Sequence, residues 1–131
     1  MVLPMAIRTP RFAVVDDDPF VLRGLRRLLR SAGFDVDTYA SGAAFLNSGG
    51  DDEPDCVVLD LHMPQTSGFE VQAQLLRRGR STPVIVITGG DNPEAQSRAL
   101  RLGAKDYFGK PVDGEALLAA IGVAIAGRRV P

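Results

Sequence analysis

Four strand-like runs of this sequence are each followed by a polar residue of a type that can bind a phosphate group or a metal ion. In chain order, the runs and polar residues are Phe12–Val15 with Asp16 and Asp17, Cys56–Leu59 with Asp60, Val84–Ile87 with Thr88, and Tyr107–Phe108 with Lys110. Ligands of open α/β sheets bind outside the carboxyl ends of the strands. If these strands are parallel, three carboxylates, a hydroxyl and an ammonium group meet at one small site.

The charges of these residues predict a cation and a type of reaction. Three carboxylates beside one lysine leave an excess of about two negative charges, which a divalent cation would offset. An all-oxygen site of few carboxylates plus water suits Mg²⁺, with Mn²⁺ as the alternative ion. A carboxylate that accepts a phosphoryl group forms an acyl phosphate. The sequence therefore predicts a phosphoryl-transfer site in which Asp60 is the candidate nucleophile.

Each of these residues also has a simpler structural explanation. Asp18 fits a helix N-cap, but that role does not account for Asp16 and Asp17, whose mutual repulsion after a buried strand costs stability unless something binds. Thr88 could be an ordinary β-branched strand end, although the two glycines after it indicate that a ligand approaches the backbone closely. Most lysines are only solvated. Lys110 becomes a candidate because it is a mobile charge able to pair with a phosphate group.

Strand and helix patterns alternate along the chain, which is typical of a parallel sheet with helices on both faces. The expected strands are Phe12–Val15, Phe34–Tyr39, a third ending at Asp60, a fourth that begins at Pro83, and the short segment Tyr107–Phe108. The expected helices begin at Pro19 and end before Gly33, span Ser41–Leu46 and Phe69–Arg78, run from Asn92 to Gly103, and follow Asp113. The fold class is therefore α/β, with five strands and five helices.

Composition indicates one globular domain and excludes several classes of function. The chain has 131 residues, of which 45% are hydrophobic, and its net charge of -1 argues against direct binding of nucleic acid. No apolar run approaches membrane-spanning length, and the start of the chain lacks a signal-peptide pattern. The single Cys56 cannot form an internal disulfide, which fits a reducing cytoplasm. We expect a flexible arm over residues 1–10, one domain over 11–127 and a tail over 128–131.

Four segments resemble the signature motifs of the receiver domain of two-component response regulators. They are Val14–Asp18, Leu59–Pro64 with Ser67–Gly68, Ile87–Gly89, and Gly103–Pro111, and they occur in the order and spacing of that family. The sequence is also similar to those of the receivers of nitrogen-fixation and LuxR-type regulators. The resemblance implies a flavodoxin-like, doubly wound sheet of five parallel strands in the order 2-1-3-4-5.

The resemblance also implies how the metal and the phosphoryl group are bound. It makes Asp60 the phosphoacceptor, with Asp17 and Asp60 as direct ligands of Mg²⁺. Asp16 would act partly through water, and the backbone carbonyl of His62 would complete the protein ligands. A zinc site at His62 is not expected, because no second histidine or nearby cysteine accompanies it.

Further roles implied by the resemblance concern the switch and its partners. Thr88 and Lys110 would hold the phosphoryl oxygens, and Tyr107 would turn inward together with Thr88 on activation. The protein would be a switch rather than an enzyme: a histidine kinase phosphorylates it, and it then controls homodimerisation, an effector domain or a partner protein. The output face is expected on the fourth helix, fifth strand and fifth helix. Such regulators carry a helix-turn-helix effector after the receiver, so this chain is either a stand-alone receiver or a piece of a longer regulator.

Two rival hypotheses come from other functional classes. A phosphatase of the haloacid dehalogenase type also uses a nucleophilic aspartate and Mg²⁺. It needs a second aspartate two residues later as general acid, and His62 occupies that position here. The other rival is a constitutive binding module with a vestigial site, which the presence of all the site residues disfavours.

Overall fold

The computed structural model describes residues 9–49, 53–90 and 92–129. Strands and helices alternate along the whole described chain. The strands are β1 Arg11–Val15, β2 Asp35–Tyr39, β3 Cys56–Asp60, β4 Val84–Thr88 and β5 Ala104–Gly109. The helices are α1 Pro19–Ser31, α2 Gly42–Leu46, α3 Gly68–Arg77, α4 Pro93–Arg101 and α5 Gly114–Arg129.

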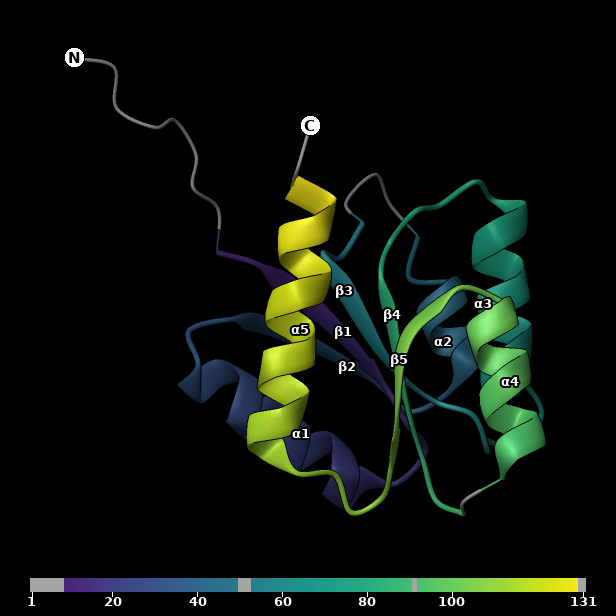
Figure 1. Cartoon of the computed structure of the whole chain (residues 1–131), viewed down its shortest axis with the longest axis horizontal. Coiled ribbons are helices and arrows are strands. Elements are labelled where there is room, and N and C mark those ends of the chain that lie inside the picture. The colour runs from purple at the N-terminus through teal and green to yellow at the C-terminus, as the bar shows by residue number, and fades with distance from the viewer. Residues whose placement is uncertain (1–8, 50–52, 91, 130–131) are drawn as a thin grey trace.

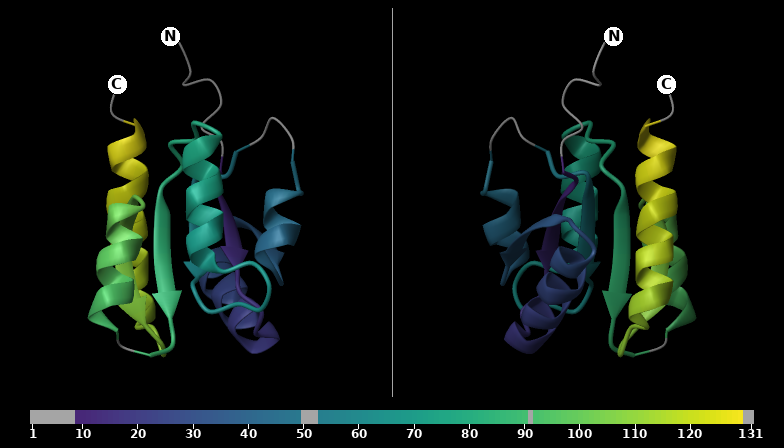
Figure 2. Two further views of the ribbon diagram at one scale, coloured as in Figure 1. Left: turned by 90° about the vertical axis from the view of Figure 1, so that its right-hand side faces the viewer. Right: turned by 90° about the vertical axis from the view of Figure 1, so that its left-hand side faces the viewer.

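All neighbouring strands pair in parallel, in the order β2-β1-β3-β4-β5. Figure 1 shows α1 and α5 on one side of this sheet and α2, α3 and α4 on the other. The side views in Figure 2 show the loops after the carboxyl ends of the strands gathered at the lower end of the molecule. The predicted flavodoxin-like, doubly wound arrangement is confirmed.

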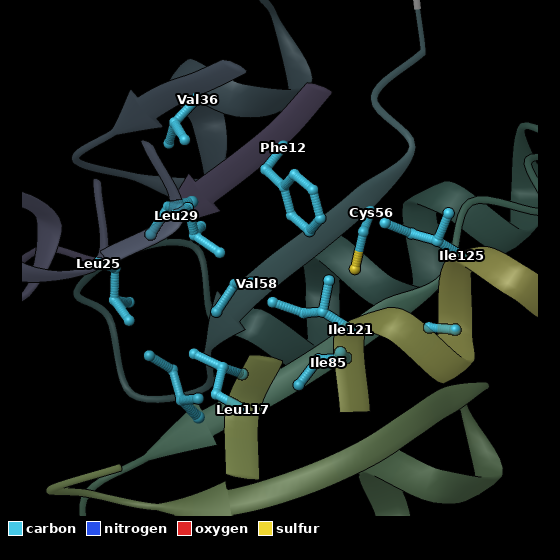
Figure 3. Close-up of a cluster of buried hydrophobic side chains, with 13 residues drawn as sticks. Phe12, Leu25, Leu29, Val36, Cys56, Val58, Ile85, Leu117, Ile121 and Ile125 are labelled. Carbon is cyan, nitrogen blue, oxygen red and sulfur yellow. The ribbon is translucent and has the colours of Figure 1, made fainter. Parts of the chain in front are cut away.

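The central strands are buried on both faces, as the unbroken apolar runs predict. Every residue of β3 and β4 is buried, and successive residues alternate between the two faces. Val58 and Ile85 belong to the core under α1 and α5 (Figure 3), whereas Val57 and Val86 belong to the core under α2, α3 and α4. Each helix therefore covers the sheet with one apolar stripe. In α5 that stripe is Leu117, Ile121 and Ile125.

Local capping residues fix where the first helix begins and ends. Asp18 is the N-cap of α1, because its Oδ1 accepts a hydrogen bond from the backbone N–H of Phe20 at 2.9 Å. Pro19 occupies the first helical position, which needs no N–H donor. Gly33 follows the helix with φ of 93°, a left-handed conformation that favours glycine. The sequence predicts all three features.

Strand β5 is longer than expected. The sequence predicts only Tyr107–Phe108, but the strand spans Ala104–Gly109. It lies at the edge of the sheet and pairs only with β4, so it tolerates exposed polar residues such as Lys105 and Asp106. These residues interrupt the apolar pattern from which a strand would be predicted. The other boundaries agree with the expected ones to within one or two residues.

At the two ends of the chain, the expected arm and tail fall mostly outside the described residues. Residues 1–8 of the expected arm and residues 130–131 of the expected tail are not described. Helix α5 continues through Arg129, past the expected domain end at residue 127. Within the described residues, no helix is both long enough and apolar enough to span a bilayer.

Candidate functional site

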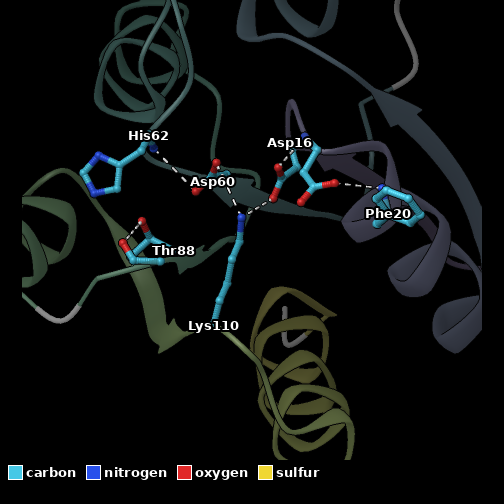
Figure 4. A network of polar contacts seen from close by, with 8 residues as sticks. Asp16, Phe20, Asp60, His62, Thr88 and Lys110 are labelled. Atoms are coloured by element: carbon cyan, nitrogen blue, oxygen red, sulfur yellow. Dashed lines mark hydrogen bonds and ion pairs between the residues drawn. The ribbon is translucent and has the colours of Figure 1, made fainter.

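The predicted site residues meet at the carboxyl edge of the sheet. Asp60 and Thr88 end β3 and β4, while Asp16 directly follows β1 and Lys110 directly follows β5. Parallel pairing of these strands puts all four positions at the same edge, where Figure 4 shows Asp60 between Lys110 and His62. The sequence-based expectation that the strand ends converge is therefore met by the geometry.

Three carboxyl groups form a compact acidic cluster at this edge. Oxygen atoms of Asp16, Asp17 and Asp60 all lie within 4.8 Å of one another. Asp16 and Asp60 are buried, whereas Asp17 is exposed to solvent. Oδ1 of Asp16 accepts a hydrogen bond from the backbone N–H of Asp18 at 2.9 Å, which fixes the orientation of that carboxyl group.

Lys110 supplies the positive charge of the site. Its Nζ lies 2.7 Å from Oδ2 of Asp16 and 3.6 Å from Oδ2 of Asp60. Its backbone N–H donates to the carbonyl of Thr88 at 2.8 Å, so the lysine is tied to the end of β4, and its peptide bond to Pro111 is cis. Burial alone would lower the pKa of Lys110, but the hydrogen bond with Asp16 and the charges of Asp60 and Asp16 outweigh burial and raise it.

Asp60 is buried in surroundings that disfavour its negative charge. Burial raises the pKa of its carboxyl group above the usual value, and the charge of Asp16 raises the pKa further. Lys110 and the backbone N–H of His62, which donates to Oδ1 of Asp60 at 3.4 Å, oppose this rise without cancelling it. A carboxylate with incompletely compensated charge gains from any added cation.

These residues fit a hard divalent cation. The cluster offers three carboxyl groups, and Lys110 is the cation that forms ion pairs with two of them. Burial raises the pKa of Asp60 most, and the nearby charge of Asp16 adds to this rise. Mg²⁺ binds to one or two carboxylates and retains several water molecules. An exposed Asp17 beside two buried carboxyl groups leaves the solvent side open for such water.

The remaining predicted residues surround this cluster. Thr88 is fully buried, and its hydroxyl donates a long hydrogen bond of 3.4 Å to the carbonyl of Gly89. His62 is exposed, and its imidazole points away from the Asp60 carboxyl group in Figure 4. Tyr107 is half-buried, its ring packs against the core under α2, α3 and α4, and its hydroxyl oxygen is buried. The ring of Tyr107 therefore already lies inward.

Gly68 contributes to the site through close packing on the backbone of Asp60, a contact that the sequence does not predict. A Cβ atom at Gly68 would clash with the carbonyl oxygen of Asp60 and would lie 2.8 Å from Cα of Leu61. The backbone N–H of Gly68 also donates to the carbonyl of Leu61 at 3.0 Å. The start of α3 is thus packed directly on the backbone of the candidate nucleophile. In the sequence, Ser67 and Gly68 belong to a family motif just before the expected helix at Phe69, and no local pattern reveals this contact.

Comparison with known proteins identifies the family. Residues 12–122 match the family described as the response regulator receiver domain. The chain belongs to this family. Receiver domains are signalling switches of two-component systems, so the coarse functional expectation from the sequence is confirmed.

Several relatives resemble this receiver domain closely. It is 41% identical over 122 residues to the response regulator protein TodT of Pseudomonas putida, with 92% of this chain and 53% of TodT covered. It is 44% identical over 109 residues to the transcriptional regulatory protein FixJ of Azorhizobium caulinodans, with 82% of this chain and 51% of FixJ covered. The solved structure of response regulator StyR superimposes with a TM-score of 0.84 at 40% identity, covering 93% of this chain and 63% of that one.

The receiver domain spans about half the length of the curated relatives it matches, 53% for TodT and 51% for FixJ. The similarity therefore concerns the receiver part of those proteins.

Proposed function

We propose that Asp60 accepts a phosphoryl group from a histidine kinase, in a reaction that depends on Mg²⁺, and that the acyl phosphate switches the conformation of the domain. The observation that carries this proposal is the position of Asp60. Its buried carboxyl group lies at the carboxyl edge of the sheet, within 4.8 Å of Asp16 and Asp17 and 3.6 Å from Lys110. Phosphoryl transfer relies mostly on positioning and charge neutralisation, and these groups can supply both.

In the proposed transfer, an oxygen of the Asp60 carboxylate bonds to phosphorus while the bond from phosphorus to the donor nitrogen breaks. Lys110 holds one phosphoryl oxygen, for which its ammonium group leaves its present partner Asp16. The hydroxyl of Thr88 donates to another phosphoryl oxygen. The match to the receiver family, the 3.6 Å distance from Lys110 to Asp60 and the position of Thr88 at the end of the strand next to β3 support these roles.

The acidic cluster supports a role in holding Mg²⁺, with Mn²⁺ as an alternative. Asp17 and Asp60 would be direct ligands, Asp16 would act partly through water, and the backbone carbonyl of His62 would complete the protein ligands. When bound, the cation neutralises charge that develops on the phosphoryl oxygens. The ammonium group of Lys110 lies near both Asp16 and Asp60 and so links these two carboxyl groups.

The proposed output face consists of α4, β5 and α5. Thr88 ends β4 just before α4, and Tyr107 lies in β5, so movement of Thr88 toward the phosphoryl group changes the space beside the Tyr107 ring. Exposed residues of both charges, Arg98, Arg101, Lys105 and Asp106, lie on α4 and β5. Mixed charges of this kind can pair across a two-fold axis. We propose that phosphorylation promotes homodimerisation, or binding of an effector domain or partner protein, through this face.

The proposal also covers the setting of the domain. We propose that residues 11–127 form a cytoplasmic receiver whose only reactions are its own phosphorylation and dephosphorylation. This receiver binds neither nucleic acid nor membrane directly. The single Cys56 is buried in β3, which suits a small apolar residue in a reducing compartment.

Treatment with a small phosphodonor tests the assignment of Asp60. A folded site that works by positioning should phosphorylate itself slowly from acetyl phosphate without a kinase. Intact mass measurement should then detect one phosphoryl group on the wild-type chain and none on Asp60→Asn. Asp35→Asn is the matched control, because Asp35 is an exposed aspartate at the opposite end of the sheet. Equal phosphorylation of Asp60→Asn and Asp35→Asn would refute the proposal.

A further inference from the structure

A buried glutamine of α3 is the feature of this molecule that the proposed site leaves unused. Gln72 is 1% exposed, and its Nε2 donates to the carbonyl of Ala99 in α4 at 2.9 Å. Its Oε1 is buried and has no hydrogen-bond partner among the described residues. A buried polar atom without a partner costs stability, and the single hydrogen bond of Nε2 offsets that cost only in part. The amide therefore calls for a functional explanation.

The carbonyl that Gln72 binds is one that α4 cannot satisfy itself. The last four carbonyls of a helix have no partner inside the helix. Beyond the end of α4, Leu102 donates to the carbonyl of Arg98 and Gly103 to that of Leu100. The carbonyl of Ala99 is bound by Gln72 instead, so a side chain of α3 completes the C-terminal end of α4.

A second contact joins the same faces of the two helices. The guanidinium carbon of Arg98 lies 4.2 Å from the centre of the Phe69 ring, a cation–π contact. Phe69 and Gln72 are three residues apart on α3, hence on one face, and Arg98 and Ala99 are adjacent on α4. We call these two contacts, Gln72 with Ala99 and Phe69 with Arg98, the α3–α4 latch. Figure 1 shows the two helices side by side.

Helix α4 packs on β5 and on the core through small side chains, mainly Ala95 and Ala99. Of its residues Pro93–Arg101, only Ala99 is buried. Its other capping contacts are internal, with the side chain of Asn92 accepting from Glu94 and Ala95. Among the described residues, the latch thus provides the side-chain hydrogen bond and the ring contact that connect α4 to another element. Loss of the latch would leave α4 held by its packing on β5 and the core, and would make a change in its position easier.

The latch is closed while Thr88 is turned away from the phosphoacceptor. The Thr88 hydroxyl donates to Gly89, and no hydrogen bond joins it to Asp60 in the described part of the chain. Thr88 ends β4, and α4 begins at Pro93. A shift of Thr88 toward Asp60 would therefore also displace the start of α4.

We propose that Gln72 is a positioning residue that sets how readily Asp60 takes up a phosphoryl group, by holding α4 in the arrangement that keeps Thr88 away. This inference rests on the proposed function. When the binding-competent state of a protein is only partly populated, its ligand binds with reduced apparent affinity. Weakening the latch raises that population, and by linkage it raises the affinity of Asp60 for a phosphoryl mimic.

Gln72→Met tests this, because methionine keeps the unbranched shape and lacks the amide. Gln74→Met is the matched control: Gln74 is a half-buried glutamine on the same helix that lines a groove toward α2. Amide exchange of residues 93–101 in metal-free protein should accelerate about three- to tenfold in Gln72→Met alone, the effect of one hydrogen bond. Beryllofluoride affinity with Mg²⁺, measured by calorimetry on the full chain, should rise by a similar factor. A purely structural glutamine would accelerate exchange without changing that affinity.

The exposed half of the latch provides a second test that does not disturb the core. Arg98→Leu should change both measurements in the same direction, and Arg77→Leu, at an exposed arginine of α3 outside the proposed output face, should change neither. Unchanged beryllofluoride affinity in both Gln72→Met and Arg98→Leu would overturn the inference, as would unchanged exchange of α4. Failure of the wild-type chain to bind beryllofluoride would instead count against the proposed function, and the exchange of α4 alone would then decide whether Gln72 holds the helix.

Discussion

The ammonium nitrogen of Lys110 lies 2.7 Å from the buried carboxyl group of Asp16. Its distance from Asp60 is longer, at 3.6 Å, so the lysine primarily compensates the charge of Asp16. Asp60 is left with only part of a counter-charge, and burial together with Asp16 raises its pKa. The candidate nucleophile is therefore the residue whose ionisation the folded protein opposes.

The metal-free protein should lose stability as Asp60 ionises. Because the folded-state pKa of Asp60 lies above its ordinary value of 3.8, the folded state holds the proton more tightly than the unfolded state. The contribution of Asp60 to stability is therefore most favourable below that value and is lost as pH rises through the folded-state pKa. Asp60→Asn should have a higher Tm than wild type at pH 7 in EDTA, with the difference shrinking toward pH 4. A lower Tm for the variant at pH 7 would contradict the charge imbalance.

Binding of Mg²⁺ should depend on Asp17 but not on its neighbour Asp18. Asp17 is an exposed member of the acidic cluster, and Asp18 caps α1. Asp17→Ala should weaken Mg²⁺ binding by roughly tenfold or more while leaving the domain folded. Asp18→Ala should instead cost about 1 kcal/mol of stability and leave Mg²⁺ affinity nearly unchanged. Calorimetric titration with Mg²⁺ and urea unfolding of both variants would separate the two roles, and equal Mg²⁺ affinities would exclude Asp17 as a ligand.

The lifetime of the acyl phosphate should depend on His62. Its backbone N–H contacts the Asp60 carboxyl group, while its exposed imidazole points away from that group, so the side chain borders the site without orienting water toward Asp60. We expect His62→Ala to admit water and to speed dephosphorylation severalfold, with phosphorylation retained. Phosphate release after removal of the phosphodonor measures this rate. Identical rates for wild type, His62→Ala and His62→Glu would mean that this side chain has no part in controlling water access.

Thr88 should be needed for the conformational response to phosphorylation, and not only for phosphoryl transfer to Asp60. Its hydroxyl is the group expected to move toward the phosphoryl oxygens, and a ligand shifts a two-state equilibrium only through contacts that differ between the states. Thr88→Ala should still accept phosphate on Asp60 but should lose the change in amide exchange around α4 and Tyr107. Thr88→Ser keeps the hydroxyl and should restore the change. A full response in Thr88→Ala would place the trigger at another residue.

Glycine at position 68 should matter far more than glycine at position 24. A methyl group at Gly68 would collide with the backbone of Asp60, whereas a Cβ at Gly24 on α1 meets nothing within 4 Å. Gly68→Ala should destabilise the domain by about 1–3 kcal/mol and slow phosphorylation by displacing Asp60. Gly24→Ala should stabilise it by roughly 0.5–1 kcal/mol, because alanine is the better helix former. Denaturant unfolding and phosphorylation rates would distinguish a displaced nucleophile from a simple loss of stability.

The sequence predicts the fold because its signals are local. Period-two and period-3.6 apolar patterns specify the elements, and residues such as Asp18 and Gly33 mark where helices begin and end. The site is predictable for a related reason, since parallel strands must bring residues at their carboxyl ends to one edge. Strand β5 is only partly visible in the sequence, because an edge strand needs no continuous apolar run.

The features that sequence reasoning misses are contacts between distant segments. Gln72 has the sequence appearance of an exposed helical residue, and only the packing of α3 against α4 makes it buried and bonded to Ala99. The preference of Lys110 for Asp16 over Asp60 likewise follows from distances that no spacing rule predicts. The contact of Gly68 with Asp60 belongs to the same class.

Helix α5 ends at the upper end of the molecule in Figure 1, whereas the strands end at the lower end, where Asp60 closes β3 and Lys110 follows β5. Any segment joined to α5 would emerge on the side of the domain remote from the acidic cluster. A phosphodonor protein and such a segment could then be engaged at the same time without competing for space. The output would have to pass along the length of the domain, so the stiffness of α5 and its packing on the sheet would set how faithfully phosphorylation is reported at the far end.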